Sequence, residues 1–175
     1  GFNFTNTIAQ QKTSVAVSKT WIAPDALKAA VTINLKQNGT VIANVTLDGT
    51  VDSNETAAWQ YTFANLDVYD ATGTKYVYTV EEATKLANFN APEITGSAAE
   101  GFVITNRVTQ KVTSVSGSKT WIDNGNAYNT RPETITIELY RDNAFFKSTA
   151  VSKTAAGYTF DQLEVYAADG HEYSY

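Results

Sequence analysis

Hydrophobic residues recur at every second position in three stretches of the chain, and each stretch carries one polar residue on its apolar face. The three sets are Val15, Val17, Lys19 and Trp21; Tyr78, Val80 and Glu82; and Phe102, Ile104, Asn106 and Val108. Strand side chains alternate between two faces, so each set lies on one face. A lone buried charge is costly and is normally paired or neutralised. The pattern therefore predicts that Lys19, Glu82 and Asn106 meet in a dry core and react covalently.

Runs typical of β-strands cover residues 13–21, 30–36, 40–47, 58–63, 75–82 and 101–108. Asn38-Gly39 between two of these runs is typical of a hairpin turn. Segment 23–29 is compatible with one helical turn, but a loop is favoured because the counterpart at 123–134 is polar and rich in Asn. Segment 84–100 is expected to be a variable loop. About seven short strands in roughly 95 residues favour an antiparallel β-sandwich.

The later part of the sequence repeats motifs of the earlier part. The matching pairs are Gly1–Asn6 with Gly101–Asn106, Ser18–Ile22 with Ser118–Ile122, and Tyr61–Phe63 with Tyr158–Phe160. Asn6 precedes Lys19 by the same interval that separates Asn106 from Lys119. A junction of constant length between homologous units predicts a regular rod of tandem repeats.

The phase of this repeat predicts three segments. Residues 1–10 are expected to be the last strand of an upstream unit, 11–109 a complete domain, and 110–175 a truncated second domain. Tyr175 aligns with Tyr78, so the counterparts of the strands that carry Glu82 and Asn106 are expected to lie outside this chain.

Composition narrows the possible functions. The 175 residues are 43% hydrophobic, which suffices for a packed core. The net charge is −5 and no basic stripe occurs, so nucleic acid and membranes are poor partners. The absence of Cys excludes disulfides and thiolate sites, and the single His excludes a zinc cluster or a catalytic triad built on His. We expect no metal and no cofactor.

Four motifs in this order resemble the B-type repeats of Gram-positive collagen adhesins, the Cna B-type domains. The motifs are Ser18-Lys19-Thr20-Trp21, Tyr61-Thr62-Phe63, Tyr78-Thr79-Val80-Glu81-Glu82 and Gly101-Phe102-Val103-Ile104-Thr105-Asn106. Related domains build Gram-positive pilins and surface stalks. The resemblance implies an inverse immunoglobulin-like β-sandwich. It also implies a spontaneous isopeptide bond between a Lys on the first strand and an Asn on the last, promoted by an acid on a neighbouring strand.

Carried over to this sequence, the resemblance makes Lys19 the amine, Asn106 the acyl group and Glu82 the acid. Glu81 is the competing acid, but strand parity places Glu82 on the face of Tyr78 and Val80 and turns Glu81 outward. In the incomplete units, Lys119 matches the amine and Asn6 the amide, and their reaction partners are expected outside this chain.

The chemistry requires an unprotonated amine. Burial disfavours the charged form of Lys19, and it favours the neutral form of a carboxyl group. Glu82 is therefore expected to be protonated before the reaction. It would polarise the Asn106 carbonyl and relay a proton to the departing nitrogen.

These observations predict a structural stalk repeat of an adhesin or pilus on the cell wall of a Gram-positive bacterium. The expected partners are neighbouring repeats of the same polypeptide, and a host matrix protein bound through another domain. The alternative is a module that itself binds an extracellular-matrix protein, through the loops at 23–29 and 84–100. A turnover enzyme is not expected, because the only proposed reaction is a single self-crosslinking that consumes the protein's own residues.

Overall fold

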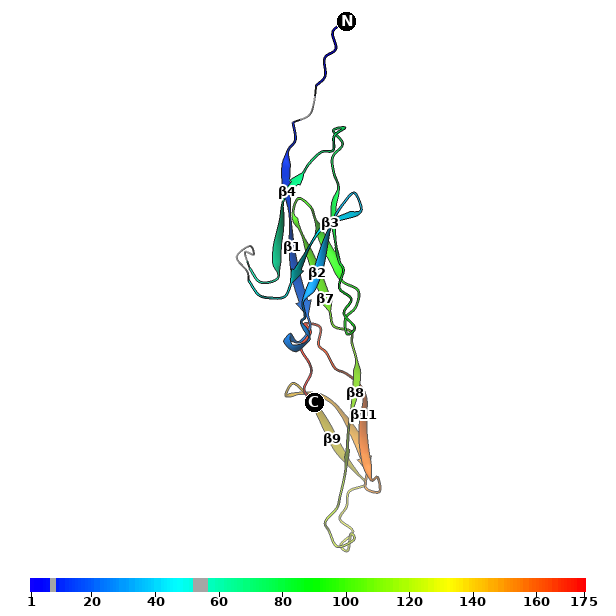
Figure 1. Ribbon diagram of the computed structural model, residues 1–175. Helices are drawn as coiled ribbons and strands as arrows, with labels where there is room; N and C mark the ends of the chain where they lie inside the picture. Colours follow the sequence, from blue (N-terminus) through cyan, green and yellow to red (C-terminus); the bar gives the residue numbers. More distant parts are fainter. Residues whose placement is uncertain (7–8, 52–56) are drawn as a thin grey trace. The chain divides into compact units, whose positions relative to one another are not determined.

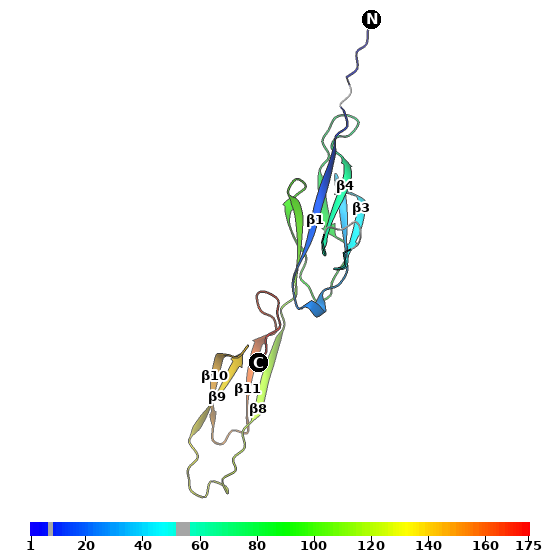
Figure 2. The same cartoon turned by 90° about the vertical axis from the view of Figure 1, so that its left-hand side faces the viewer.

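The structure is a computed structural model that describes residues 1–6, 9–51 and 57–175. The chain divides into two compact units, Gly1–Thr109 and Gln110–Tyr175 (Figures 1 and 2). In the described part of the chain, the regular elements are eleven β-strands and one short 3₁₀ helix, η1 (Asp25–Leu27).

Unit 1 is a sandwich of two sheets. The first sheet has the order β4-β1-β7-β6 and the second the order β3-β2-β5. The strands are β1 (Lys12–Ile22), β2 (Val31–Gln37), β3 (Thr40–Leu47), β4 (Gln60–Asp67), β5 (Tyr78–Glu82), β6 (Glu93–Ser97) and β7 (Gly101–Arg107). The inward sides of both sheets form one core that includes Val15, Ile33, Leu35, Phe63 and Ile104. The predicted β-sandwich is therefore present.

One strand pair departs from the antiparallel expectation. The first and last strands, β1 and β7, run parallel, with Lys19 opposite Ile104 and Trp21 opposite Asn106. A parallel pair needs a long crossover, and here strands β2 to β6 supply it, because they lie between β1 and β7 in the sequence. The first sheet is consequently mixed.

Two predicted loops contain regular structure. The 84–100 segment, expected to be a loop, includes β6, which pairs with β7 antiparallel. Sequence reasoning missed this edge strand because its residues are largely exposed and give no apolar alternation. The 23–29 segment contains η1. The predicted hairpin at Asn38-Gly39 is confirmed, since both residues have positive φ angles and join β2 to β3.

Unit 2 contains two strand pairs. Strand β8 (Val112–Ser118) pairs with β11 (Gly157–Glu164), and β9 (Thr134–Arg141) pairs with β10 (Ala144–Ser152). Leu139, Phe160 and Leu163 form its buried cluster. The β8–β11 register sets Val115 opposite Phe160, as the β1–β4 register sets Val15 opposite Phe63. The sequence repeat is therefore also a repeat of strand pairing.

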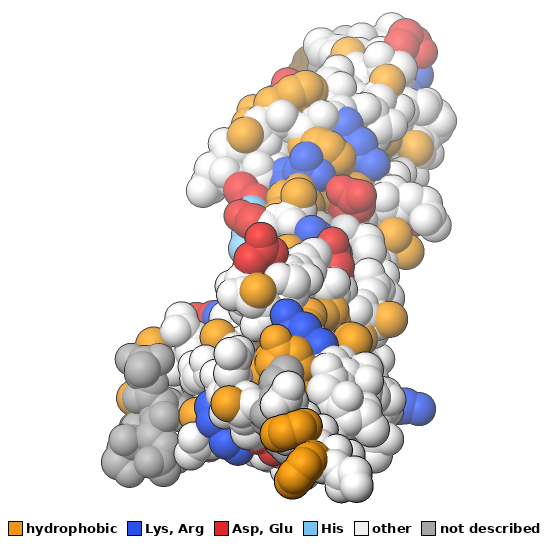
Figure 3. All heavy atoms as spheres, turned by 90° about the horizontal axis from the view of Figure 1, so that it is seen from above, with side chains coloured by type: hydrophobic (Ala, Val, Ile, Leu, Met, Phe, Trp, Pro, Cys, Tyr) orange, Lys and Arg blue, Asp and Glu red, His pale blue; other side chains and the backbone are white. Residues whose placement is uncertain are grey.

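Residues 1–6 belong to no strand of this chain, and Phe2 and Phe4 are almost fully exposed. The interpretation of residues 1–10 as an upstream strand remains a prediction, and residues 7–8 lie outside the described residues. In the described ranges, no helix has the length and apolar character that crossing a bilayer requires. On the face drawn in Figure 3, acidic and basic side chains are scattered among uncharged ones.

Candidate crosslinking site

Lys19 lies in the interior of unit 1. It belongs to the inward set of β1, and its side chain has 0% exposure. Its Nζ donates to the backbone oxygens of Thr20 at 2.9 Å and Ile104 at 3.4 Å. The ammonium also stands 3.9 Å from the centroid of the Trp21 ring. Two carbonyl oxygens and an indole face thus surround the amine in place of water.

Glu82 reaches the same point from the second sheet. It is the last residue of β5, and its side chain is 1% exposed. One carboxyl oxygen, Oε2, lies 4.0 Å from Lys19 Nζ. Glu81 points outward, as parity predicts: its side chain is 40% exposed, forms an ion pair with Lys36 and accepts a hydrogen bond from Asn34.

Asn106 completes the group. It is a β7 residue with 1% exposure, and its Nδ2 donates to Glu82 Oε1 at 2.7 Å. In the described part of the protein, Asn106 Oδ1 and Glu82 Oε2 are buried and accept no hydrogen bond. The two oxygens of Glu82 therefore face different nitrogens: Oε1 faces the amide nitrogen and Oε2 faces the amine.

Burial decides the electrostatics of the amine. Loss of solvent lowers the pKa of Lys19 from 10.5 to about 8, and the nearby negative charge of Glu82 opposes this effect without cancelling it. A neutral amine is the form that attacks a carbonyl carbon. The lowered pKa thus raises the neutral, reactive fraction of Lys19 at pH 7 from well under a hundredth to about a tenth.

Aromatic rings fix the position of the Trp21 indole under the amine. Trp59 and Phe89 each meet it edge-on, with ring centroids 5.3 Å away. Sequence reasoning did not predict the contact between Lys19 and Trp21, although their two-residue spacing on one strand was the available signal. The same contact recurs in unit 2, where Lys119 Nζ lies 3.7 Å from the Trp121 ring.

A cavity of about 340 Å³ adjoins the site. Glu82 and Asn106 line one side, and segment 84–92 lines the other; Lys19 is not part of the lining. Phe89 and Asn90 attach this segment to the end of β7 and the residue after it. Phe89 forms a β-bridge with Val108, and Asn90 N donates a hydrogen bond to Arg107 O. The acid and amide therefore border a space that the amine does not reach.

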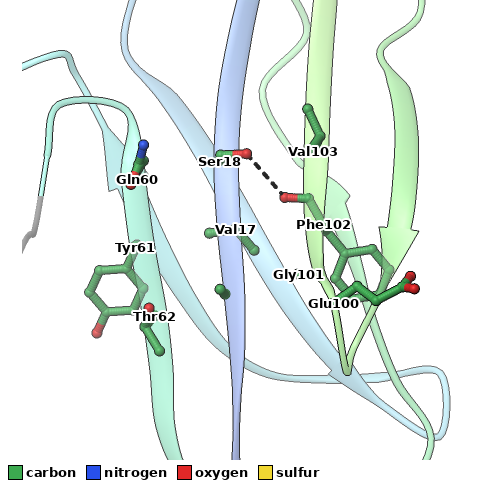
Figure 4. Close-up of a pocket in the computed structure, with 10 residues that line it drawn as sticks. Val17, Ser18, Gln60, Tyr61, Thr62, Glu100, Gly101, Phe102 and Val103 are labelled. Carbon is green, nitrogen blue, oxygen red and sulfur yellow. Dashed lines mark hydrogen bonds between the residues drawn. The ribbon is translucent and has the colours of Figure 1, made fainter.

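A separate hollow of about 260 Å³ lies along β1 between β4 and β7 (Figure 4). Ser18 Oγ donates to Phe102 O there at 3.4 Å. Among the described residues that line the hollow, Glu100 alone carries a charge. It offers no group of reactive side chains comparable with that around Lys19.

The structure does not bring together the residues named for the incomplete units. Asn6 is exposed and lies outside any strand. Lys119 follows the end of β8, is half-buried, and donates to its neighbour Thr120 O at 2.6 Å. Neither residue contacts an acid–amide pair like that of unit 1 in the described contacts.

Comparison with known proteins finds relatives of this chain. The family pattern of the Cna protein B-type domain matches residues 15–107 and 115–175. A collagen adhesin of Staphylococcus aureus is 30% identical over 95% of this chain, which spans 14% of that protein. The crystal structure of two B repeat units, B1B2, of the collagen binding protein of S. aureus aligns with 93% of this chain and 43% of its own, at 28% identity and a TM-score of 0.64. The chain thus spans less than half of each relative, and it belongs to the Cna protein B-type domain family.

Proposed function

We propose that this chain is part of the stalk of a Gram-positive surface adhesin or pilus, and that unit 1 is locked by an isopeptide bond between Lys19 and Asn106. The observation that carries the proposal is the buried convergence of an amine, a carboxyl group and a carboxamide from both sheets of one sandwich. Three polar groups without solvent are costly unless they have a function or a complete set of partners. Two of their oxygens accept no hydrogen bond within the described residues.

The arrangement supports a proton relay by Glu82. Neutral Lys19 attacks Asn106 Cγ, so that the Nζ–Cγ bond forms and the Cγ–Nδ2 bond breaks. Glu82 takes one proton from Nζ and gives one to Nδ2, which leaves as ammonia. Glu82 ends the reaction unchanged. The orientation of the Asn106 amide favours this role over polarisation of the carbonyl, since Glu82 contacts Nδ2 and not Oδ1. By holding the amine and the carboxamide in place, the fold can lower the activation barrier of their reaction by about 7–11 kcal/mol.

The family of the chain supports the spacer role. The matched relative is a collagen adhesin, and the matched structure consists of B repeat units of a collagen binding protein. We place this chain on the outer surface of a Gram-positive bacterium, next to further repeats of its own polypeptide. Another domain would bind the host matrix protein. The reaction consumes its own residues, so unit 1 does not turn over as an enzyme.

The test is the intact mass of the purified chain. We expect it to be lower than the sequence mass by one ammonia, and a linked peptide pair containing Lys19 and Asn106 should appear after digestion. Lys19→Met and Glu82→Gln should restore the full mass. Glu81→Gln is the matched control, because that side chain points outward, and it should keep the loss of ammonia. A full mass in the folded wild-type chain would refute the crosslink.

A further inference from the structure

His171, the only histidine of the chain, lies between two carboxylates of unit 2. Its Nδ1 is 2.7 Å from Asp169 Oδ1, and its Nε2 is 3.0 Å from Asp142 Oδ2. An ionised carboxylate can only accept hydrogen bonds, and a neutral imidazole carries a single N–H group. Both contacts are therefore hydrogen bonds only when the ring is the doubly protonated imidazolium.

The ring connects two turns of unit 2. One is the turn 168–170, which contains Asp169, and the other joins β9 to β10 and contains Asp142. Asp142 also binds the chain beyond the ring, because its Oδ1 accepts from Ser174 N and its N donates to Ser174 O, both at 2.9 Å. The next residue, Tyr175, packs against the buried cluster of unit 2. These contacts form a joint between residues 168–175 and the β9–β10 turn.

Unit 1 forms the corresponding joint with uncharged side chains at both positions. Asn38, in the turn between β2 and β3, aligns with Asp142 in the repeat. Its N donates to Val77 O at 2.8 Å and its Oδ1 accepts from Val77 N at 2.9 Å, so the backbone contacts are the same. Thr74 aligns with His171. The charged pair is therefore particular to unit 2.

We propose that His171 is a pH-sensitive bridge, whose protonated ring strengthens the joint between residues 168–175 and the β9–β10 turn, and whose loss of a proton weakens this joint in unit 2 but not its counterpart in unit 1. The backbone contacts between Asp142 and Ser174 do not involve the ring. Deprotonation therefore lowers the stability of the joint without opening it. The inference goes beyond the stalk function and does not rest on the crosslink.

The surrounding charges keep the two carboxylates ionised. Hydrogen bonds from backbone N–H groups are the main reason why the pKa values of Asp142 and Asp169 lie below their usual range. Arg141 precedes Asp142 and also favours its negative charge. Arg141 Nη1 in turn lies 3.8 Å from Glu164 Oε2 of β11, and Glu172 follows the ring in the sequence. The group of this joint that titrates near neutral pH is thus the imidazole.

The direction of the pH effect follows from these contacts. Hydrogen bonds with Asp142 and Asp169 raise the pKa of His171 above its ordinary 6.5. A group whose pKa is raised by folding stabilises the fold fully below its unfolded pKa, and this contribution is lost as the pH rises through the folded-state pKa. Unit 2 should therefore become less stable between pH 6 and pH 9, where Asp, Glu, Lys and Arg largely keep their charges.

The first test is an NMR titration of the imidazole in the full chain, in which a single histidine gives an unambiguous signal. We expect a pKa above 6.5, and Asp142→Asn should lower it. Glu133→Gln is the matched control, because it removes a carboxylate that the whole length of β9 separates from Asp142; it should leave the pKa nearly unchanged. A pKa of 6.5 or below in the parent chain, or one that Asp142→Asn does not lower, would overturn the inference.

The second test gives unit 2 the residues that unit 1 uses. The double variant Asp142→Asn, His171→Thr reproduces Asn38 and Thr74, which unit 1 accommodates in the same backbone frame. The urea midpoint of unit 2, read from amide NMR signals of β9 and β11, should shift to lower urea from pH 6 to pH 9 in the parent chain. The double variant should lose most of this shift. Equal shifts in the two chains would overturn the inference, whatever the intact mass shows about the crosslink.

Discussion

At the scale of single residues, the central fact is a competition of two electrostatic effects on Lys19. Removal from water penalises its positive charge, while Glu82 at 4.0 Å stabilises it. Burial is the larger effect, and the pKa falls to about 8. If the ion pair dominated instead, the amine would stay protonated and unreactive. Because this pKa still lies above neutral pH, most unreacted molecules would carry a buried positive charge at pH 7, which the crosslink would remove.

The rate of crosslinking should therefore rise with pH. The neutral fraction of an amine with a pKa of about 8 is about a hundredth at pH 6, about a tenth at pH 7 and about half at pH 8. We expect the rate of ammonia loss to increase about tenfold from pH 6 to pH 7 and to level off above pH 8. The measurement follows intact mass during refolding of chain that is recovered unfolded from inclusion bodies and whose full sequence mass is verified beforehand.

This profile also separates two roles of Glu82. A proton relay that starts from the carboxylate requires only a neutral amine, and gives the rising profile. Polarisation of the Asn106 carbonyl by a protonated Glu82 would need the acid form together with the neutral amine, and the loss of one form with rising pH would offset the gain of the other. A rate that does not rise between pH 6 and pH 8 would thus contradict the relay.

At the scale of elements, sequence reasoning located the strands that carry the site and missed the edge strand β6, which carries no residue of the site. Strands β1, β5 and β7 alternate buried and exposed residues, so their parity placed Lys19, Glu82 and Asn106 inward. The edge strand β6 buries none of its residues and was taken for a loop. The parallel β1–β7 pairing was also missed, because alternation fixes the face of a side chain and not the direction of its neighbour. Contacts such as that of Lys19 with Trp21 depend on this tertiary geometry.

The hairpin that brings β6 beside β7 should depend on Gly96. Its φ is +92°, and a Cβ at this position would overlap the carbonyl oxygen of Gly101. Gly39 is the matched control, with a φ of +85° and open space around it. We expect Gly39→Ala to cost about 1 kcal/mol for its backbone, and Gly96→Ala to cost about 1–3 kcal/mol more for the overlap.

The free energy of unfolding of unit 1, measured by denaturant titration, would give both costs. Every variant would also carry Lys19→Met, so that the crosslink contributes to none of the values. Equal costs for the two glycines would show that the β6–β7 hairpin relaxes without resistance. A larger cost for Gly39→Ala would contradict the assigned geometry.

At the scale of the whole molecule, the crosslink would join the first and last strands of unit 1 and enclose β2 to β6 in one covalent loop. Closing a loop of nearly 100 residues removes roughly 4–5 kcal/mol of denatured-state entropy in the chain-entropy model. The mechanical effect is more specific. Tension that enters along β1 would cross from Lys19 to Asn106 and leave after β7, without loading the strands between them.

Pulling on the two ends of the chain should therefore lengthen unit 2 alone. Between residues 12 and 19, β1 is already an extended strand and has little length to release. The Lys19–Asn106 bond would carry the tension past residues 20–105. About 300 Å of chain length, at about 3.5 Å per residue, would therefore not be released by pulling. Residues 110–175 contain no acid and amide matched to Lys119 by the repeat, so unit 2 serves as an internal reference that extends.

In single-molecule stretching, Lys19→Met should add a second extension event of about 300 Å. An event of that size in the wild-type chain would show that the load passes through the sheets of unit 1 and not through the bond.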